Sequence, residues 1–175
     1  MSLKLFKCLN KLLDTVSIEQ GRLALSLVSS DLGALLHSVE KDFSSHPSPG
    51  NNHLVLTIQP DLPEISADPE RLIQVIANLV SNAERHTRNG TITISLTGEP
   101  GWQTICVSDT GTGMSEEMRK NALKGYVSAD KDYWRHGIGL YVCHQIITAH
   151  SGKIWLKSKE GEGTQVFFSL PEEES

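Results

Sequence analysis

Apolar residues along this chain follow two spacings, which predict a mixture of helices and strands. Spacing of three to four residues predicts helices over residues 3–19, 29–43, 68–87, 115–124 and 137–150. Two-residue alternation and short apolar runs predict strands over residues 22–28, 53–59, 64–67, 91–97, 103–109, 153–159 and 164–170. Polar turns join the last four strands into two antiparallel hairpins. The order of elements therefore predicts an α/β sandwich, with helices on one face of a mixed, mostly antiparallel sheet.

The helix that begins at Asp68 carries the clearest polar pattern. Asp68 is a favourable N-cap, and its buried stripe should consist of Leu72, Ile76, Leu79, Val80 and Ala83. We expect Asn78, Asn82 and Arg85 to share a polar face opposite this stripe. An amide oxygen can complete the shell of a Mg²⁺ ion whose other ligands are phosphate oxygens and water. On its own, this spacing is more typical of a plain solvent-exposed face.

Two glycine-containing stretches are the other candidates for chemistry. In "SDTGTGM", the carboxylate of Asp109 stands at a strand end, where it can accept a hydrogen bond from an exocyclic amine, and Gly111 and Gly113 would let the loop pass close to a ligand. In "HGIGL", Gly137 and Gly139 are expected to open a helix, whose exposed N–H groups attract anions. Each stretch alone is also typical of an ordinary turn.

Composition and charge narrow the class of protein. The 175 residues are 38% hydrophobic and 21% charged, as expected for one globular domain, and the formal charge of −5 argues against a nucleic-acid partner. The three cysteines are scattered, which favours a reduced, cytoplasmic setting. No signal peptide or apolar run of membrane-spanning length is visible, so we expect no direct membrane contact from this segment.

The order of four short motifs resembles the ATP-binding catalytic domain of two-component sensor histidine kinases. The motifs are Asn-Leu-x-x-Asn-Ala at 78–83, Asp-x-Gly-x-Gly at 109–113, Gly-x-Gly-Leu at 137–140 and Gly-x-Gly-Thr at 161–164. The resemblance covers roughly residues 22–171 and implies the Bergerat α/β sandwich of the superfamily that also contains gyrase- and chaperone-type ATPases. Residues 3–25 resemble the end of that family's second dimerisation helix. This implies a helix tail and linker over residues 1–21 and an ATP-binding domain over 22–175.

The resemblance also implies roles for individual positions. Asn82 corresponds to the Mg²⁺ ligand, Asn78 and Arg85 lie near the phosphates, and Asp109 binds the adenine amino group. The other implied nucleotide contacts are His86, Gly111, Gly113, Gly137, Ile138, Gly139, Leu140 and Thr164. The implied ligands are ATP and Mg²⁺, covered by a mobile lid between residues 114 and 136. The lid departs from the family, because Leu123 and Tyr126 stand where two phenylalanines are common.

The implied activity is transfer of the γ-phosphoryl group of ATP to a histidine. None of the seven histidines here lies in the acceptor motif of the family. We therefore expect the acceptor on a dimerisation segment of the same full-length protein, with a response regulator as a further partner. The sequence does not decide whether the full-length protein is anchored in a membrane.

Two other hypotheses stay open, and the first of them is an ATPase or a serine/threonine-directed kinase of the same superfamily. Related ATPases carry a glutamate at the position of Asn78, where it activates water, so the amide favours phosphotransfer over rapid hydrolysis. A serine/threonine-directed kinase of the anti-sigma type is a further alternative within the superfamily. A degenerate interaction module is the third hypothesis, and the intact Asn82, Asp109, Gly137 and Gly139 argue against it.

Overall fold

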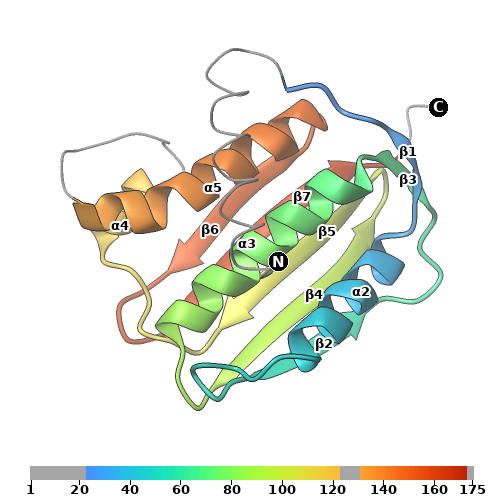
Figure 1. Cartoon of the computed structure of the whole chain (residues 1–175). Coiled ribbons are helices and arrows are strands. Elements are labelled where there is room, and N and C mark those ends of the chain that lie inside the picture. Colours follow the sequence, from blue (N-terminus) through green and yellow to red (C-terminus); the bar gives the residue numbers. More distant parts are fainter. Residues whose placement is uncertain (1–22, 123–130, 173–175) are drawn as a thin grey trace.

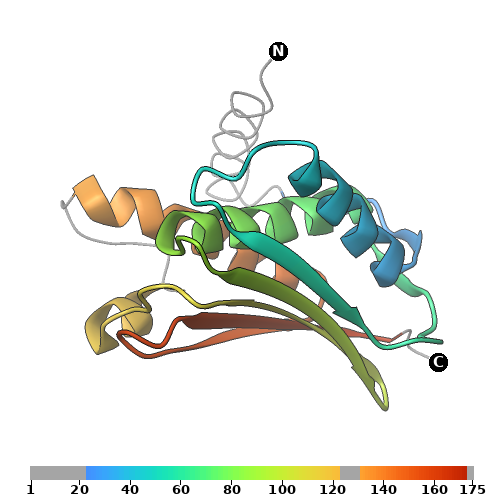
Figure 2. The same cartoon turned by 90° about the horizontal axis from the view of Figure 1, so that it is seen from below.

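The structure, a computed structural model, describes residues 23–122 and 131–172, and for residues 121 and 131–139 it describes the backbone alone. Its elements form two layers, with a five-stranded sheet on one side and the helices α2, α3 and α5 on the other (Figures 1 and 2). This arrangement confirms the predicted α/β sandwich. The helix predicted over 3–19 and the proposed boundary after residue 21 lie outside the described residues.

The large sheet has the strand order β2-β4-β5-β7-β6. Its strands are β2 (His53–Ile58), β4 (Thr91–Glu99), β5 (Trp102–Asp109), β6 (Lys153–Ser158) and β7 (Thr164–Pro171). The hairpins β4–β5 and β6–β7 were both predicted, and β5 and β7 are antiparallel neighbours in the middle of the sheet. The edge strand β2 runs parallel to β4, which makes the sheet mixed.

A second, two-stranded sheet pairs β1 (Val28–Ser30) with β3 (Ile65–Ala67). The predicted strand over 22–28 is therefore wrong at residues 23–27, which are not in a strand, whereas Val28 is the first residue of β1. The alternation of "RLALSLV" marks an extended chain, but β3 offers only three residues to pair with, and they pair with Val28–Ser30. A strand needs a partner for its backbone groups, and the alternation alone does not supply one.

The helices are α2 (Leu32–Ser44), α3 (Pro69–His86), α4 (Glu116–Asn121) and α5 (Lys131–Ala149). The first three begin where the sequence offers a capping side chain: Asp31 accepts from the Ala34 N–H, Asp68 from the Arg71 N–H and Ser115 from the Met118 N–H. These bonds satisfy N–H groups that have no partner inside the helix.

The core lies between the helices and the inner face of the large sheet. In β4 every second residue, Ile92, Ile94 and Leu96, is buried against the helices. The predicted stripe of α3 is buried, and Val75 belongs to it as well. Because α3 runs between α2 and α5 across the sheet (Figure 1), its two flanks are packed and only one side of the helix is open to solvent.

Candidate functional site

The turn that follows β5 is held by the carboxyl group of Asp109. Its Oδ1 accepts the backbone N–H of Gly111 at 2.9 Å and that of Thr164, the first residue of β7, at 3.3 Å. Asp109 is half-buried, and this burial raises the pKa of its carboxyl group while the two N–H donors oppose the shift. Both N–H groups bond the same oxygen, so they orient the group without using Oδ2.

The glycines of this turn make close approaches to the protein's own backbone. A Cβ on Gly111 would lie 2.2 Å from the carbonyl oxygen of His86, and one on Gly113 would lie 2.1 Å from that of Lys159. The N–H of Thr112 donates to the same His86 carbonyl at 3.1 Å. These contacts show that both glycines let the turn pack between the end of α3 and the β6–β7 turn. The predicted approach of the glycines to a ligand stays a prediction.

His86, the last residue of α3, lies next to this turn. Burial, followed by the guanidinium of Arg85, lowers the pKa of its imidazole, and the carboxylate of Asp109 acts in the opposite direction. Thr164 is buried, and its hydroxyl lies 2.8 Å from that of Ser158. The structure therefore brings together five of the predicted site residues, namely His86, Asp109, Gly111, Gly113 and Thr164.

The polar side chains of α3 are only partly arranged as we expected. Asn82 and the exposed Arg85 do pair, through a hydrogen bond from the guanidinium to Oδ1 of Asn82. Asn78 is not opposite the buried stripe: it is 5% exposed, and its Nδ2 has no hydrogen-bond partner among the described residues. The reason is that α5 packs along this flank of α3, where the Sγ of Cys143 contacts the carbonyl of Val75 at 3.8 Å.

The prediction that Gly137 and Gly139 open a helix is wrong. α5 begins at Lys131, so both glycines and Ile138 lie in its interior, where backbone N–H groups are not those of an exposed helix start. The six residues of α5 before Gly137 also belong to the stretch that we had assigned to the lid. Leu140 follows them and is buried in the core. The side chain of Ile138 and the lid residues 123–130 lie outside what the structure describes.

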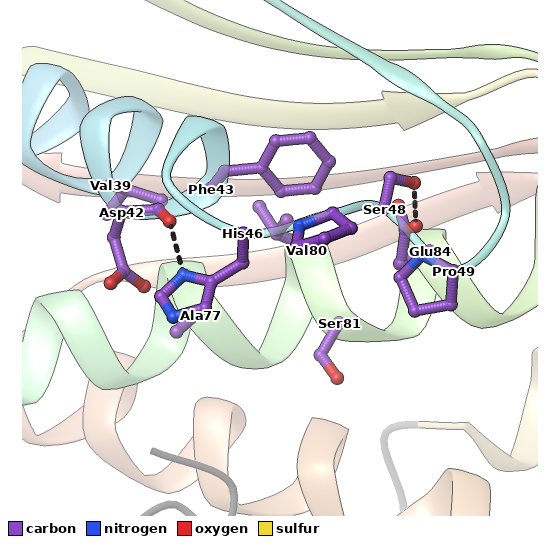
Figure 3. Close-up of a pocket in the computed structure, with 11 residues that line it drawn as sticks. Val39, Asp42, Phe43, His46, Ser48, Pro49, Ala77, Val80, Ser81 and Glu84 are labelled. Carbon is purple, nitrogen blue, oxygen red and sulfur yellow. Dashed lines mark hydrogen bonds between the residues drawn. The ribbon is translucent and has the colours of Figure 1, made fainter. Parts of the chain in front are cut away.

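Asn52 and Ser48 support the end of α3, although no motif in the sequence marks either residue. Asn52 is 6% exposed and donates to the carbonyl of Thr87 at 2.8 Å and to Glu84 at 3.1 Å. Glu84 also accepts from the hydroxyl of Ser48, as Figure 3 shows in the pocket that borders α2 and α3. The only signal in the sequence was a polar loop, "SSHPSPGNN", and its partners lie more than thirty residues away.

The described residues contain no group of three or more His, Cys, Asp or Glu side chains that could hold a metal ion. No helix in the described part of the chain combines the length and the apolar character of a membrane span.

Comparison with known families identifies this arrangement. Residues 67–174, which include α3, the turn after β5, α5 and the β6–β7 hairpin, match the family described as histidine kinase-, DNA gyrase B- and HSP90-like ATPases. The chain belongs to this ATPase family. The residues matched contain all four motifs on which the resemblance rests.

Individual relatives include a sensory kinase and a sensor protein. The chain is 39% identical to the adaptive-response sensory kinase SasA of Synechococcus elongatus, over 67% of this chain and 32% of that protein. It is 32% identical to the sensor protein GacS of Pseudomonas syringae pv. syringae, over 95% of this chain and 19% of that protein. The chain thus spans about a third or less of the length of these two relatives.

Solved structures show the same fold. The catalytic domain of histidine kinase ThkA superposes with a TM-score of 0.74 at 26% identity, covering 85% of this chain and 97% of that domain. Full-length ShkA in complex with AMPPNP superposes with a TM-score of 0.83 at 24% identity, covering 98% of this chain and 36% of ShkA. The similarity to ThkA supports an ATPase domain of the histidine kinase type.

Proposed function

We propose that this chain binds ATP and presents its γ-phosphoryl group to a histidine side chain in two-component signalling. The observation that carries the proposal is the cluster at the end of α3, where the oriented carboxyl group of Asp109 lies beside His86 in an ATPase domain related to sensor kinases. In the transfer, the bond between the γ-phosphorus and the bridging oxygen breaks, a nitrogen–phosphorus bond forms to the imidazole, and ADP leaves.

The site residues divide into two ends. At the adenine end, Oδ2 of Asp109 accepts from the adenine amino group, and His86 and Thr164 border the base. At the phosphate end, the amide Nδ2 of Asn78 is a buried donor without a protein partner among the described residues, which suits a phosphate oxygen. Arg85 supplies positive charge to the phosphates, and Leu140 packs beneath the phosphates.

Mg²⁺ fits this donor set. Its preference is for oxygen ligands and retained waters, with one or two protein atoms and phosphate oxygens completing the shell. Oδ1 of Asn82 is such an atom, and it would exchange its hydrogen bond with Arg85 for the ion. When bound, the ion neutralises phosphate charge, and Asn82 holds it beside the phosphates.

Phosphotransfer is favoured over hydrolysis because, in the described part of α3, no carboxylate stands at the position of the water-activating glutamate of related ATPases. Asn78 is an amide and cannot take a proton from water. Glu84 is the nearest carboxylate of α3 in the sequence, but the hydroxyl of Ser48 and the N–H of Gly50 already donate to it on the α2 side of the helix. An imidazole nucleophile needs positioning more than a base.

The acceptor histidine is proposed to lie on a dimerisation segment outside this chain, to which residues 1–21 would connect the ATP-binding domain of residues 22–175. A response regulator is the proposed final acceptor. ThkA has been solved in a complex with the response regulator TrrA, and 94% of the present chain superposes on that kinase with a TM-score of 0.74. The proposed location is the cytoplasm.

Mixing the chain with a separately produced dimerisation segment and γ-labelled ATP tests the proposal. We expect acid-labile, base-stable label on the segment, as phosphohistidine gives.

The variant Asp109→Asn should abolish transfer and most ATP binding, because its amide offers a donor or a weaker acceptor to the adenine amine. Asn82→Ala should weaken binding of Mg-ATP more than binding of ATP in EDTA.

Three outcomes would overturn this assignment. Unchanged ATP affinity in Asp109→Asn, measured by calorimetry, would place the adenine elsewhere. Steady release of inorganic phosphate without label on the segment would identify an ATPase instead, and label on serine or threonine of an added protein would identify the anti-sigma type of kinase.

A further inference from the structure

The chain that ends α3 and leads into β4, residues 84–91, lies between two other segments. On one side it contacts the turn after β5: the carbonyl of His86 accepts from Thr112, and the N–H of Thr91 donates to the hydroxyl of Thr110 at 3.1 Å. On the other side it contacts the loop before β2, where the N–H of Asn89 donates to the carbonyl of Gly50 at 2.8 Å. The position of this segment therefore depends on both neighbours.

Among the residues of the loop before β2, Asn52 makes the largest number of hydrogen bonds to residues 84–91. Its Nδ2 donates to the carbonyl of Thr87 at 2.8 Å and to Oε2 of Glu84 at 3.1 Å, and its Oδ1 accepts the N–H of Gly90 at 3.0 Å. The side chain is 6% exposed, so water does not replace these bonds when they are lost. One buried amide thus fixes three points of the segment.

The bonds matter because α3 ends abruptly. Thr87 is in an extended conformation, with φ −121° and ψ 134°, and no glycine closes the helix. The carbonyls at this end therefore take their donors from other segments. Thr87 receives one from Asn52, and His86 receives one from the turn that contains Asp109.

We propose that Asn52 is a positioning residue of the nucleotide site. It fixes the position of the end of α3 relative to residues 109–113, so that His86 and the carboxyl group of Asp109 face the same adenine. It does this through Thr87 and without touching the nucleotide. The inference rests on the proposed ATP site for its effect on binding, whereas the coupling between the loop and the turn stands independently of any ligand.

The first test is nucleotide binding by Asn52→Ala, measured by calorimetry at a temperature where its circular dichroism equals that of the wild type. We expect its affinity for ATP to fall about tenfold or more. Its preference for ATP over GTP should fall as well, because a displaced Asp109 no longer selects the adenine amine. A variant that was only partly unfolded would bind both nucleotides less but would keep the same preference.

Two further variants act as controls. Ser45→Ala removes an exposed hydroxyl that bonds only the end of α2, through the carbonyl of Asp42 and His46, and it should bind ATP like the wild type. Asn52→Asp keeps an acceptor for Gly90 but cannot donate to Thr87 and repels Glu84, so it should be impaired at least as much as the alanine variant. Wild-type affinity and preference in Asn52→Asp would overturn the proposal.

Amide hydrogen exchange without nucleotide is the second test. In Asn52→Ala, exchange should become faster at Gly90 and also at Thr112, whose N–H bonds the carbonyl of His86 across the segment. Exchange in β6 should not change. Unchanged exchange at Thr112 would overturn the coupling, whereas failure of the wild type to bind ATP would overturn only the proposed function.

Discussion

At the scale of single residues, the half-buried carboxyl group of Asp109 affects the stability of the fold as well as the candidate site. Burial raises the pKa of this group in the folded protein, so folding disfavours its ionised form. Its contribution to the free energy of unfolding is therefore most favourable below the ordinary pKa of an aspartate, about 3.9, and becomes less favourable as the pH rises through the raised value. The ionised form of Asp109 therefore lowers the free energy of unfolding, and we propose that the carboxyl group is kept for binding adenine.

The variant Asp109→Asn should separate the effect of the carboxyl group on ATP binding from its effect on stability. The side-chain oxygen of asparagine can accept both N–H groups that now bond Oδ1, and it carries no charge to be buried. We expect the variant to be at least as stable as the wild type at pH 7 and to lose this advantage as the pH falls towards 4. Urea unfolding across this range measures the difference. A variant less stable than the wild type at pH 7 would contradict the explanation.

At the scale of elements, the start of α3 combines a local and a long-range role in one side chain. Oδ1 of Asp68 caps the helix by accepting from Arg71 at 3.2 Å, while Oδ2 accepts the N–H of Ser26 at 2.9 Å. The N–H of Asp68 itself donates to Nε2 of His150, at the end of α5, at 3.0 Å. Asp31 caps α2 by a bond to Ala34 alone, and it is exposed.

The two capping residues therefore make a matched pair for mutation. Asp68→Ala should lower the free energy of unfolding by about 2–3 kcal/mol, because the N–H groups of Arg71 and Ser26 both lose a buried carboxylate acceptor. Asp31→Ala should lower it by about 1 kcal/mol, the usual value for an exposed cap. Chemical denaturation of both variants provides the comparison, and equal losses would show that the bond to Ser26 contributes nothing.

At the scale of the whole molecule, the site exists because three segments distant in the sequence meet. The end of α3, the turn after β5 and the β6–β7 turn contact one another through backbone groups. The N–H of Gly161 donates to the carbonyl of Thr112 at 2.7 Å, and the N–H of Met114 donates to the hydroxyl of Ser158 at 2.8 Å. A Cβ on Gly163 would lie 2.1 Å from the carbonyl oxygen of Asp109.

Gly161 and Gly163 allow this meeting of segments to be tested. Both have a φ of +83°, but a Cβ on Gly161 would meet nothing within 4 Å. Gly161→Ala should cost about 1–2 kcal/mol of stability, for the backbone conformation alone. Gly163→Ala should cost about 3 kcal/mol or more, because the methyl group also pushes against Asp109. Gly163→Ala should also lower the affinity for ATP by more than its smaller folded fraction explains, whereas Gly161→Ala should not. Titration calorimetry measures both affinities.

Features that depend on neighbouring residues were determined by the sequence alone. The capping residues Asp31, Asp68 and Ser115, the two hairpins and the buried stripe of α3 all follow from spacing and from local hydrogen bonds. The order of the four motifs was also sufficient to place the chain in its family. Each of these signals lies within a few consecutive residues or in the order of the motifs along the chain.

The tertiary structure decided what each segment packs against. It buried Asn78 against the α5 side of α3, placed Gly137 inside a helix instead of at its start, and brought Gly111 against the carbonyl of His86. It also supplied Asn52, which no local pattern marked as important. Each of these outcomes depends on a partner tens of residues away, because backbone groups at the ends of helices and strands are satisfied by whichever segment the fold brings beside them.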